Sequence, residues 1–138
     1  MGKDSEKHLV GQPIFKQIID LLPRDKFEEL VTKYDSDKYH KRFSSWIELV
    51  SLLFGVLSRC DSNGEICAGM EGLQGKLNYL GFDSAPVKST FGDGLRDRKN
   101  DLFKDFYFAL LTHFSSLCRS AQWKESLLTS FIYLITLP

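Results

Sequence analysis

Apolar side chains recur at helical spacing in six segments of the chain, and short polar stretches separate these segments. The most regular stripe predicts a central helix from Ser45 to about Arg59, and its apolar positions are Trp46, Leu49, Val50, Leu53 and Leu57. The other predicted helices cover residues 12–22, 25–34, 62–73, 89–98 and 103–114. No βαβ alternation and no internal repeat appears. The pattern therefore predicts an all-α protein of five to six short helices in a compact bundle.

Polar residues at the starts of these segments have the spacing of helix caps. A capping box places a polar N-cap three residues before a Glu. It is predicted three times, for the pairs Asp25 with Glu28, Ser45 with Glu48, and Ser62 with Glu65. Ser89 is the N-cap candidate of the next helix. Inner faces are predicted for the first helix at Ile14, Phe15, Ile18 and Leu22, and for the last at Phe103, Phe106, Tyr107, Leu110 and Phe114.

The two ends of the chain differ in character from its middle. Residues 1–10 are polar and are expected to be a flexible N-terminus, and residues 11–117 form the predicted helical domain. Residues 118–138 mix polar and β-branched residues without a helical stripe, so their structure stays open. The apolar stretch at 127–137 is too short to span a bilayer. Since no secretory signal pattern is visible, we expect a cytoplasmic protein without a membrane partner.

Composition narrows the classes of function. A length of 138 residues fits one domain, and 18 Lys plus Arg balance 18 Asp plus Glu, so a nucleic-acid role must rest on local clusters. Three widely spaced cysteines form neither a disulfide framework nor a zinc motif.

No residue pattern predicts catalysis or a cofactor. Asp93, Asp97, Asp101 and Asp105 repeat every four residues, but a two-metal site needs carboxylates that converge from different elements. A row of this kind is typical of a solvated helix face. The histidines have no nucleophile partner at a familiar spacing. The Gly92-x-Gly94 pair does not follow a strand, so it is not a dinucleotide fingerprint. We expect no catalytic residue, no metal site and no cofactor.

Basic residues are the stronger candidates for binding, and they form two groups. The first consists of Lys38, Lys41 and Arg42, interleaved with Tyr39 and His40. The second lies on and beside the predicted helix 89–98 and consists of Lys88, Arg96, Arg98 and Lys99. If Phe91 faces inward on that helix, Leu95 and Arg98 lie near the same face, whereas Ser89, Gly92 and Arg96 project outward together. Both groups also fit an ordinary solvated surface, and Asp93 and Asp97 would repel phosphate.

Three segments carry a resemblance to a known family. They are SSWIELVSLLFGVLSRCDS at 44–62, EICAGMEGL at 65–73 and KSTFGDGLRDRKNDLFKDFYFALL at 88–111. From Gly11 to Phe114 the chain resembles the N-terminal domain of DDE-class insertion-sequence transposases. In such proteins a short helix of pattern S-T-x-x-x-A-x-x-x-R follows a loop that ends in Pro, and here this helix begins at Ser89. Gly64, Gly92 and Gly94 stand where helix-favouring or small residues are usual.

The resemblance implies a function and a missing part. It implies a non-catalytic domain with helix-turn-helix character that binds double-stranded DNA at the terminal inverted repeats of its element, with the segment 89–98 as recognition helix. The DNA-contacting residues would be Lys88, Ser89, Thr90, Gly92, Arg96, Lys99, Lys41 and Arg42. The family's catalytic core, a ribonuclease-H-like fold, would follow the helix 103–114. Residues 118–138 differ from the expected approach to that core, and a truncated or frame-shifted copy of the element would explain them.

A second hypothesis needs no DNA contact. Transposases work as multimers on paired DNA ends, and the Phe-rich helix 103–114 could present an apolar face to another subunit or to the catalytic domain. The chain would then be a multimerisation or inter-domain docking module.

Overall fold

The computed structural model describes residues 14–73 and 75–117, and the expectations for residues 1–10 and 118–138 fall outside them. The described chain is all-α, as the hydrophobic pattern predicted. Its elements are α1 (Ile14–Asp20), α2 (Arg24–Tyr34), α3 (Ser45–Leu57), α4 (Asn63–Glu71), the 3₁₀ helix η1 (Leu77–Leu80), α5 (Lys88–Asp97) and α6 (Asp101–Leu117).

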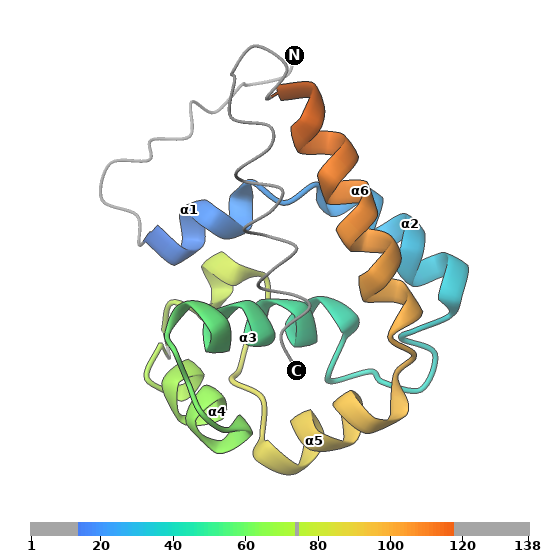
Figure 1. Cartoon of the computed structure of the whole chain (residues 1–138). Coiled ribbons are helices and arrows are strands. Elements are labelled where there is room, and N and C mark those ends of the chain that lie inside the picture. Colours follow the sequence, from blue (N-terminus) through green and yellow to red (C-terminus); the bar gives the residue numbers. More distant parts are fainter. Residues whose placement is uncertain (1–13, 74, 118–138) are drawn as a thin grey trace, which may run out of the picture.

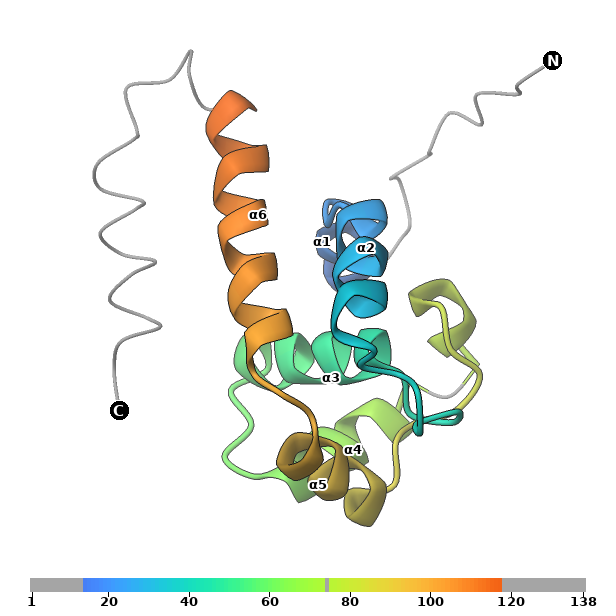
Figure 2. The ribbon, with the colours of Figure 1, turned by 90° about the vertical axis from the view of Figure 1, so that its right-hand side faces the viewer.

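Helix α3 lies in the middle of the fold. Helices α1, α2 and α6 lie on one side of it, and α4 and α5 lie on the other (Figures 1 and 2). The main packing pairs are α3 with α4, α2 with α6, and α4 with α5. The arrangement places α5 at the end of the molecule opposite α1.

Two of the three predicted N-caps are wrong and one, Ser62, is confirmed, although the Glu65 carboxylate accepts from the backbone N–H of Asp61 and not from that of Ser62. Ser62 caps α4 by accepting a hydrogen bond from the backbone N–H of Glu65 at 3.2 Å. Helix α3 is capped one residue earlier than predicted, by Ser44, which accepts from Ile47. Helix α2 follows Pro23 with no side-chain cap, because Asp25 already lies inside the first turn.

The inner faces of the first and last helices differ from the predictions. In α1, Ile19 is the buried residue and Ile14 is exposed. In α6, Phe106 is buried as predicted, but Leu102 is also fully buried and was missed. Which side of a helix is buried depends on the direction from which its neighbours pack, so spacing alone does not identify the buried positions.

Contacts between α2 and α6 join the N-terminal and C-terminal parts of the described chain. Phe27 of α2 lies at the centre of an aromatic cluster with Trp46 and Phe106. At the end of α2, the Tyr34 hydroxyl donates to Asp105 at 2.5 Å and the Lys33 ammonium lies 3.0 Å from the same oxygen. These two donors, Tyr34 first, hold the pKa of Asp105 below its ordinary value.

The connection between α4 and α5 is relevant to the predicted helix-turn-helix character, because that motif joins its two helices by a short turn. Residues 72–87 connect the two helices and include η1, so this connector is longer than the short turn of a standard motif. Helix-turn-helix character therefore remains a prediction. The four aspartates at 93, 97, 101 and 105 do not lie along one continuous helix, because α5 ends at Asp97 and α6 begins at Asp101.

Candidate functional site

Helix α5 carries most of the residues that the sequence assigned to DNA contact. Its N-cap is Val87, which has no side-chain cap, so the predicted N-cap Ser89 is wrong. Lys88, Ser89 and Thr90 are exposed residues of the first turn, where backbone N–H groups have no partner within a helix. Polar side chains and open N–H donors therefore meet at this end of α5.

Buried and exposed residues lie on opposite sides of α5, as the helical spacing predicted. Phe91 is fully buried, whereas Arg96 is exposed. Gly92 is half-buried, with open space where a Cβ atom would stand. Ser89, Gly92 and Arg96 thus border the outer side of α5, and a ligand could approach the backbone closely at Gly92.

Arg96 is paired with acidic neighbours. Its guanidinium lies 2.9 Å from Asp97 and 3.1 Å from Asp93, and its side chain is 71% exposed. The hydrogen bond to Asp97 is the main reason that the pKa of Arg96 is raised and the pKa of Asp97 is lowered. Exposed pairs of this kind are weak. These pairs offset the positive charge of α5.

The two lysines beside this helix lie at opposite ends of it. The Lys88 ammonium would lie 3.6 Å from a Cβ atom on Gly64, so Lys88 reaches across to the start of α4. Lys99 is exposed in the short joint between α5 and α6. The two cations therefore lie near the two ends of α5.

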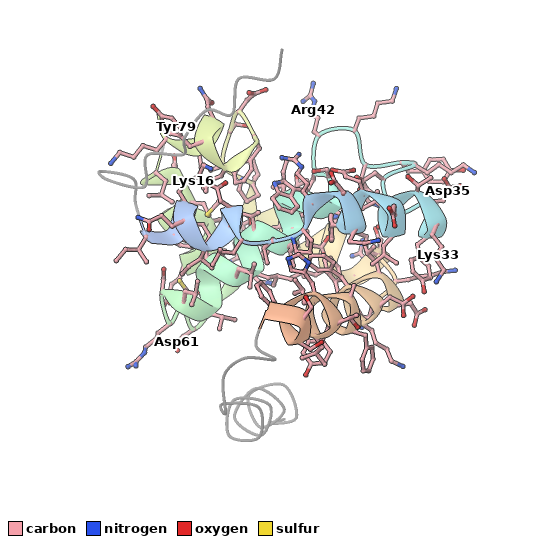
Figure 3. All side chains as sticks on the ribbon, turned by 90° about the horizontal axis from the view of Figure 1, so that it is seen from above. Lys16, Lys33, Asp35, Arg42, Asp61 and Tyr79 are labelled. Atoms are coloured by element: carbon pink, nitrogen blue, oxygen red, sulfur yellow. The ribbon has the colours of Figure 1, made fainter. Side chains whose placement is uncertain are left out.

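Residues 38–42 form a second cationic element, here called the basic loop. It lies between α2 and α3, after Asp35, which has a positive φ of 53°. Lys38 pairs with Asp35 at 3.4 Å. Lys41 and Arg42 are exposed and form no ion pair with any residue of the ranges 14–73 and 75–117. Arg42 projects away from the helices at the edge of the molecule (Figure 3).

The fold brings the basic loop and α5 together. They line a shallow hollow of about 470 Å³, whose lining residues are Lys38, Tyr39, His40, Lys41, Arg42, Phe43 and Thr90. None of these residues is acidic. Lys41, Arg42 and Thr90, which the sequence assigned to DNA contact from two distant segments, therefore share one concave surface.

Arg98 lies beneath the basic loop and does not belong to its surface. Its side chain is 2% exposed and pairs with Glu48 of α3. The same guanidinium donates to the carbonyl oxygen of Phe43 and lies 3.3 Å from Asp37. Burial raises the pKa of Glu48, and the Arg98 guanidinium opposes that rise. The spacing from Phe91 predicted that Arg98 lies near the inner face of this helix, and its burial confirms that prediction.

Among the described residues, no three side chains of the His, Cys, Asp or Glu type lie close enough together to hold a metal ion. Asp93 and Asp97 pair with Arg96, and Asp105 binds Tyr34 and Lys33, so members of the acidic row lie in separate contacts. In the same part of the chain no helix has the length and apolarity needed to cross a membrane.

These observations define an all-helical domain in which a basic loop and the exposed side of one helix meet at a shared hollow. The chain belongs to a family described as a domain of unknown function (DUF4372), whose match covers residues 10–83. No curated protein and no solved structure matches the chain. The matched residues include the basic loop and the Arg98 partners Asp37, Phe43 and Glu48, whereas α5 and Arg98 follow them.

Proposed function

We propose that this chain is the non-catalytic DNA-binding domain of a cytoplasmic transposase and that it recognises the terminal inverted repeats of an insertion element. The resemblance of residues 11–114 to the N-terminal domain of DDE-class transposases suggests this role. A separate catalytic domain would supply the metal chemistry, so this domain needs no cofactor of its own.

The observation that carries the proposal is the hollow shared by the basic loop and Thr90. Phosphate contacts supply most of the affinity for duplex DNA and fix its register. Lys41 and Arg42 suit this role because both are exposed and neither is neutralised by a carboxylate of the described residues. Lys88 and Lys99 would extend the phosphate contacts along α5.

Base reading would fall to the outer side of α5. Ser89 and Thr90 can donate to phosphate or base edges, and Gly92 lets the backbone approach the groove. Arg96 could reach a guanine once DNA displaces Asp93 and Asp97. We therefore assign the basic loop to affinity and Arg96 to sequence preference.

The test measures how strongly variants of the domain bind DNA duplexes that the wild type has selected from a random pool. We expect the double variant Lys41→Ala, Arg42→Ala to bind all selected sequences more weakly. The slope of log K against log salt concentration should decrease in magnitude by about two, because two phosphate contacts are lost. Arg96→Ala should instead relax sequence preference.

The matched control is the double variant of Lys26→Ala and Lys76→Ala, which removes two exposed cations from other parts of the surface. It should leave the salt dependence near that of the wild type. Equal effects of the two double variants would refute the assignment of the basic loop, and failure to select any duplex would refute DNA binding.

A second candidate function is a protein-interaction module, and Phe108 favours it. Phe108 lies on α6, and its side chain is 54% exposed, which is unusual for a large aromatic residue. If this face mediates self-association, the mass measured by light scattering should rise with concentration, and Phe108→Ser should abolish the rise. A monomer at all concentrations would exclude self-association, and docking to the catalytic domain would then need a separate binding measurement.

A further inference from the structure

Arg98 connects three segments at the base of the basic loop. It is the C-cap residue of α5, and its guanidinium is buried. One nitrogen pairs with Glu48 on α3. A second nitrogen donates to the carbonyl oxygen of Phe43, directly after the loop, and pairs with Asp37, directly before it. One side chain thus links both ends of the loop to α3 and to α5.

Polar contacts also join the two ends of the loop to each other. Asp37 accepts hydrogen bonds from the backbone N–H and the hydroxyl of Ser45, both at 2.7 Å. The Ser45 hydroxyl also lies 2.7 Å from that of Ser36. The loop is therefore closed at its base, and its exposed cations extend from a fixed and largely buried polar platform.

Phe43 gives the loop a second attachment to α5. Its ring packs edge-on against Phe91, with 5.7 Å between the ring centres. A Cβ atom on Gly94 would lie 2.5 Å from the Phe43 ring, so a glycine permits this close approach. Both the ring and the carbonyl oxygen of Phe43 are thus held by the α5 segment, and the loop lies beside Thr90 as a result.

We propose that Arg98 is a positioning residue that holds the basic loop in register with the exposed side of α5, so that both can contact one DNA duplex. This inference rests on the proposed function. Stability alone does not explain the buried charge, since apolar residues of similar volume often replace such pairs without loss. An apolar residue could not bind Asp37 and Phe43 together, whereas the planar guanidinium fork can.

The decisive variant removes both charges of the buried pair, by Arg98→Met with Glu48→Met. We expect its thermal midpoint to stay near that of the wild type. Its affinity for the selected duplexes should nevertheless fall as far as that of the Lys41→Ala, Arg42→Ala variant, with the same reduction of the salt dependence by about two. Amide hydrogen exchange of residues 36–43 should become faster.

Two further variants sharpen the test. Arg98→Lys keeps the charge opposite Glu48, but one ammonium cannot reach all three partners, so loop exchange should rise and affinity should fall. The control pair, Lys16→Met with Asp20→Met, removes an ion pair within α1 and should change neither quantity.

The possible results separate the two proposals. The positioning role would be overturned if a folded Arg98→Met, Glu48→Met variant kept the DNA affinity and the amide hydrogen exchange rates of the wild type. The same result for Arg98→Lys would also overturn it. If the wild type binds no duplex, the proposed function fails, and faster exchange of residues 36–43 in the variants still supports the part of Arg98 in fixing the loop.

Discussion

Replacing Glu48 with alanine is expected to lower the free energy of unfolding by about 3–5 kcal/mol, the range for a buried ion pair that loses one partner. The reason is that the Arg98 guanidinium stays buried after the change and loses its closest carboxylate. Asp37 at 3.3 Å offers only a longer contact, and Arg98 Nε already has no hydrogen-bond partner among the described residues. Urea unfolding measures the loss. An unchanged m-value, the slope of the free energy of unfolding against urea concentration, would show that the fold is kept.

The matched control for this prediction is Glu29→Ala. Glu29 is also a helical glutamate with a basic partner, but both Glu29 and Lys26 are exposed and lie 3.8 Å apart. Its removal should change the free energy of unfolding by about 0.5 kcal/mol or less. A similar small effect for Glu48→Ala would contradict the prediction, and it would mean that Asp37 or solvent neutralises Arg98.

The parts of the fold that the sequence predicts well depend on neighbours along the chain. The existence of α3 and the Ser62 cap of α4 involve residues within a few positions of each other, so their spacing carries the information. The predicted stripe of α3 is right at Trp46 and Val50, which are buried, but it is wrong at Leu57, which is 52% exposed. The outward position of Arg96 follows in the same way from the helical period and the single assumption that Phe91 is buried.

The cap of α3 shows where local spacing becomes ambiguous. Ser44 and Ser45 are both acceptable N-caps, and Glu48 stands three residues after the second, which favours Ser45. In the fold, Ser45 binds Asp37 and Glu48 binds Arg98. These partners come from other segments, so the pattern of α3 alone could not indicate them.

The candidate site itself depends on tertiary contacts. The sequence identified Lys41, Arg42 and Thr90 separately, but nothing in their spacing indicated that they line one hollow. The inward direction of Arg98 was predictable, whereas its partners were not, because a buried cation can be satisfied by carboxylates from any segment. Local patterns thus supplied the residues of the site, and the fold supplied their arrangement.

The second large effect is expected at Phe27, where alanine should lower the free energy of unfolding by about 3–5 kcal/mol. Phe27 is fully buried, and its ring centre lies 4.9 Å from that of Phe106 and 5.6 Å from that of Trp46. These two residues belong to α6 and α3, so the truncation leaves a cavity where three helices meet and removes edge-to-face contacts. Urea unfolding again measures the change.

Phe108→Ala is the matched control, because it removes the same atoms from a helical position that is 54% exposed. Measured at a concentration where the chain is monomeric, it should lower the free energy of unfolding by about 1 kcal/mol or less, because the ring is half exposed and contacts only Tyr107 among the aromatic rings of the described residues. The comparison isolates the contribution of the cavity and of the buried ring contacts, since the two changes are chemically identical. Equal losses at the two positions would show that α2, α3 and α6 do not share the packed aromatic core on which the position of α6 depends.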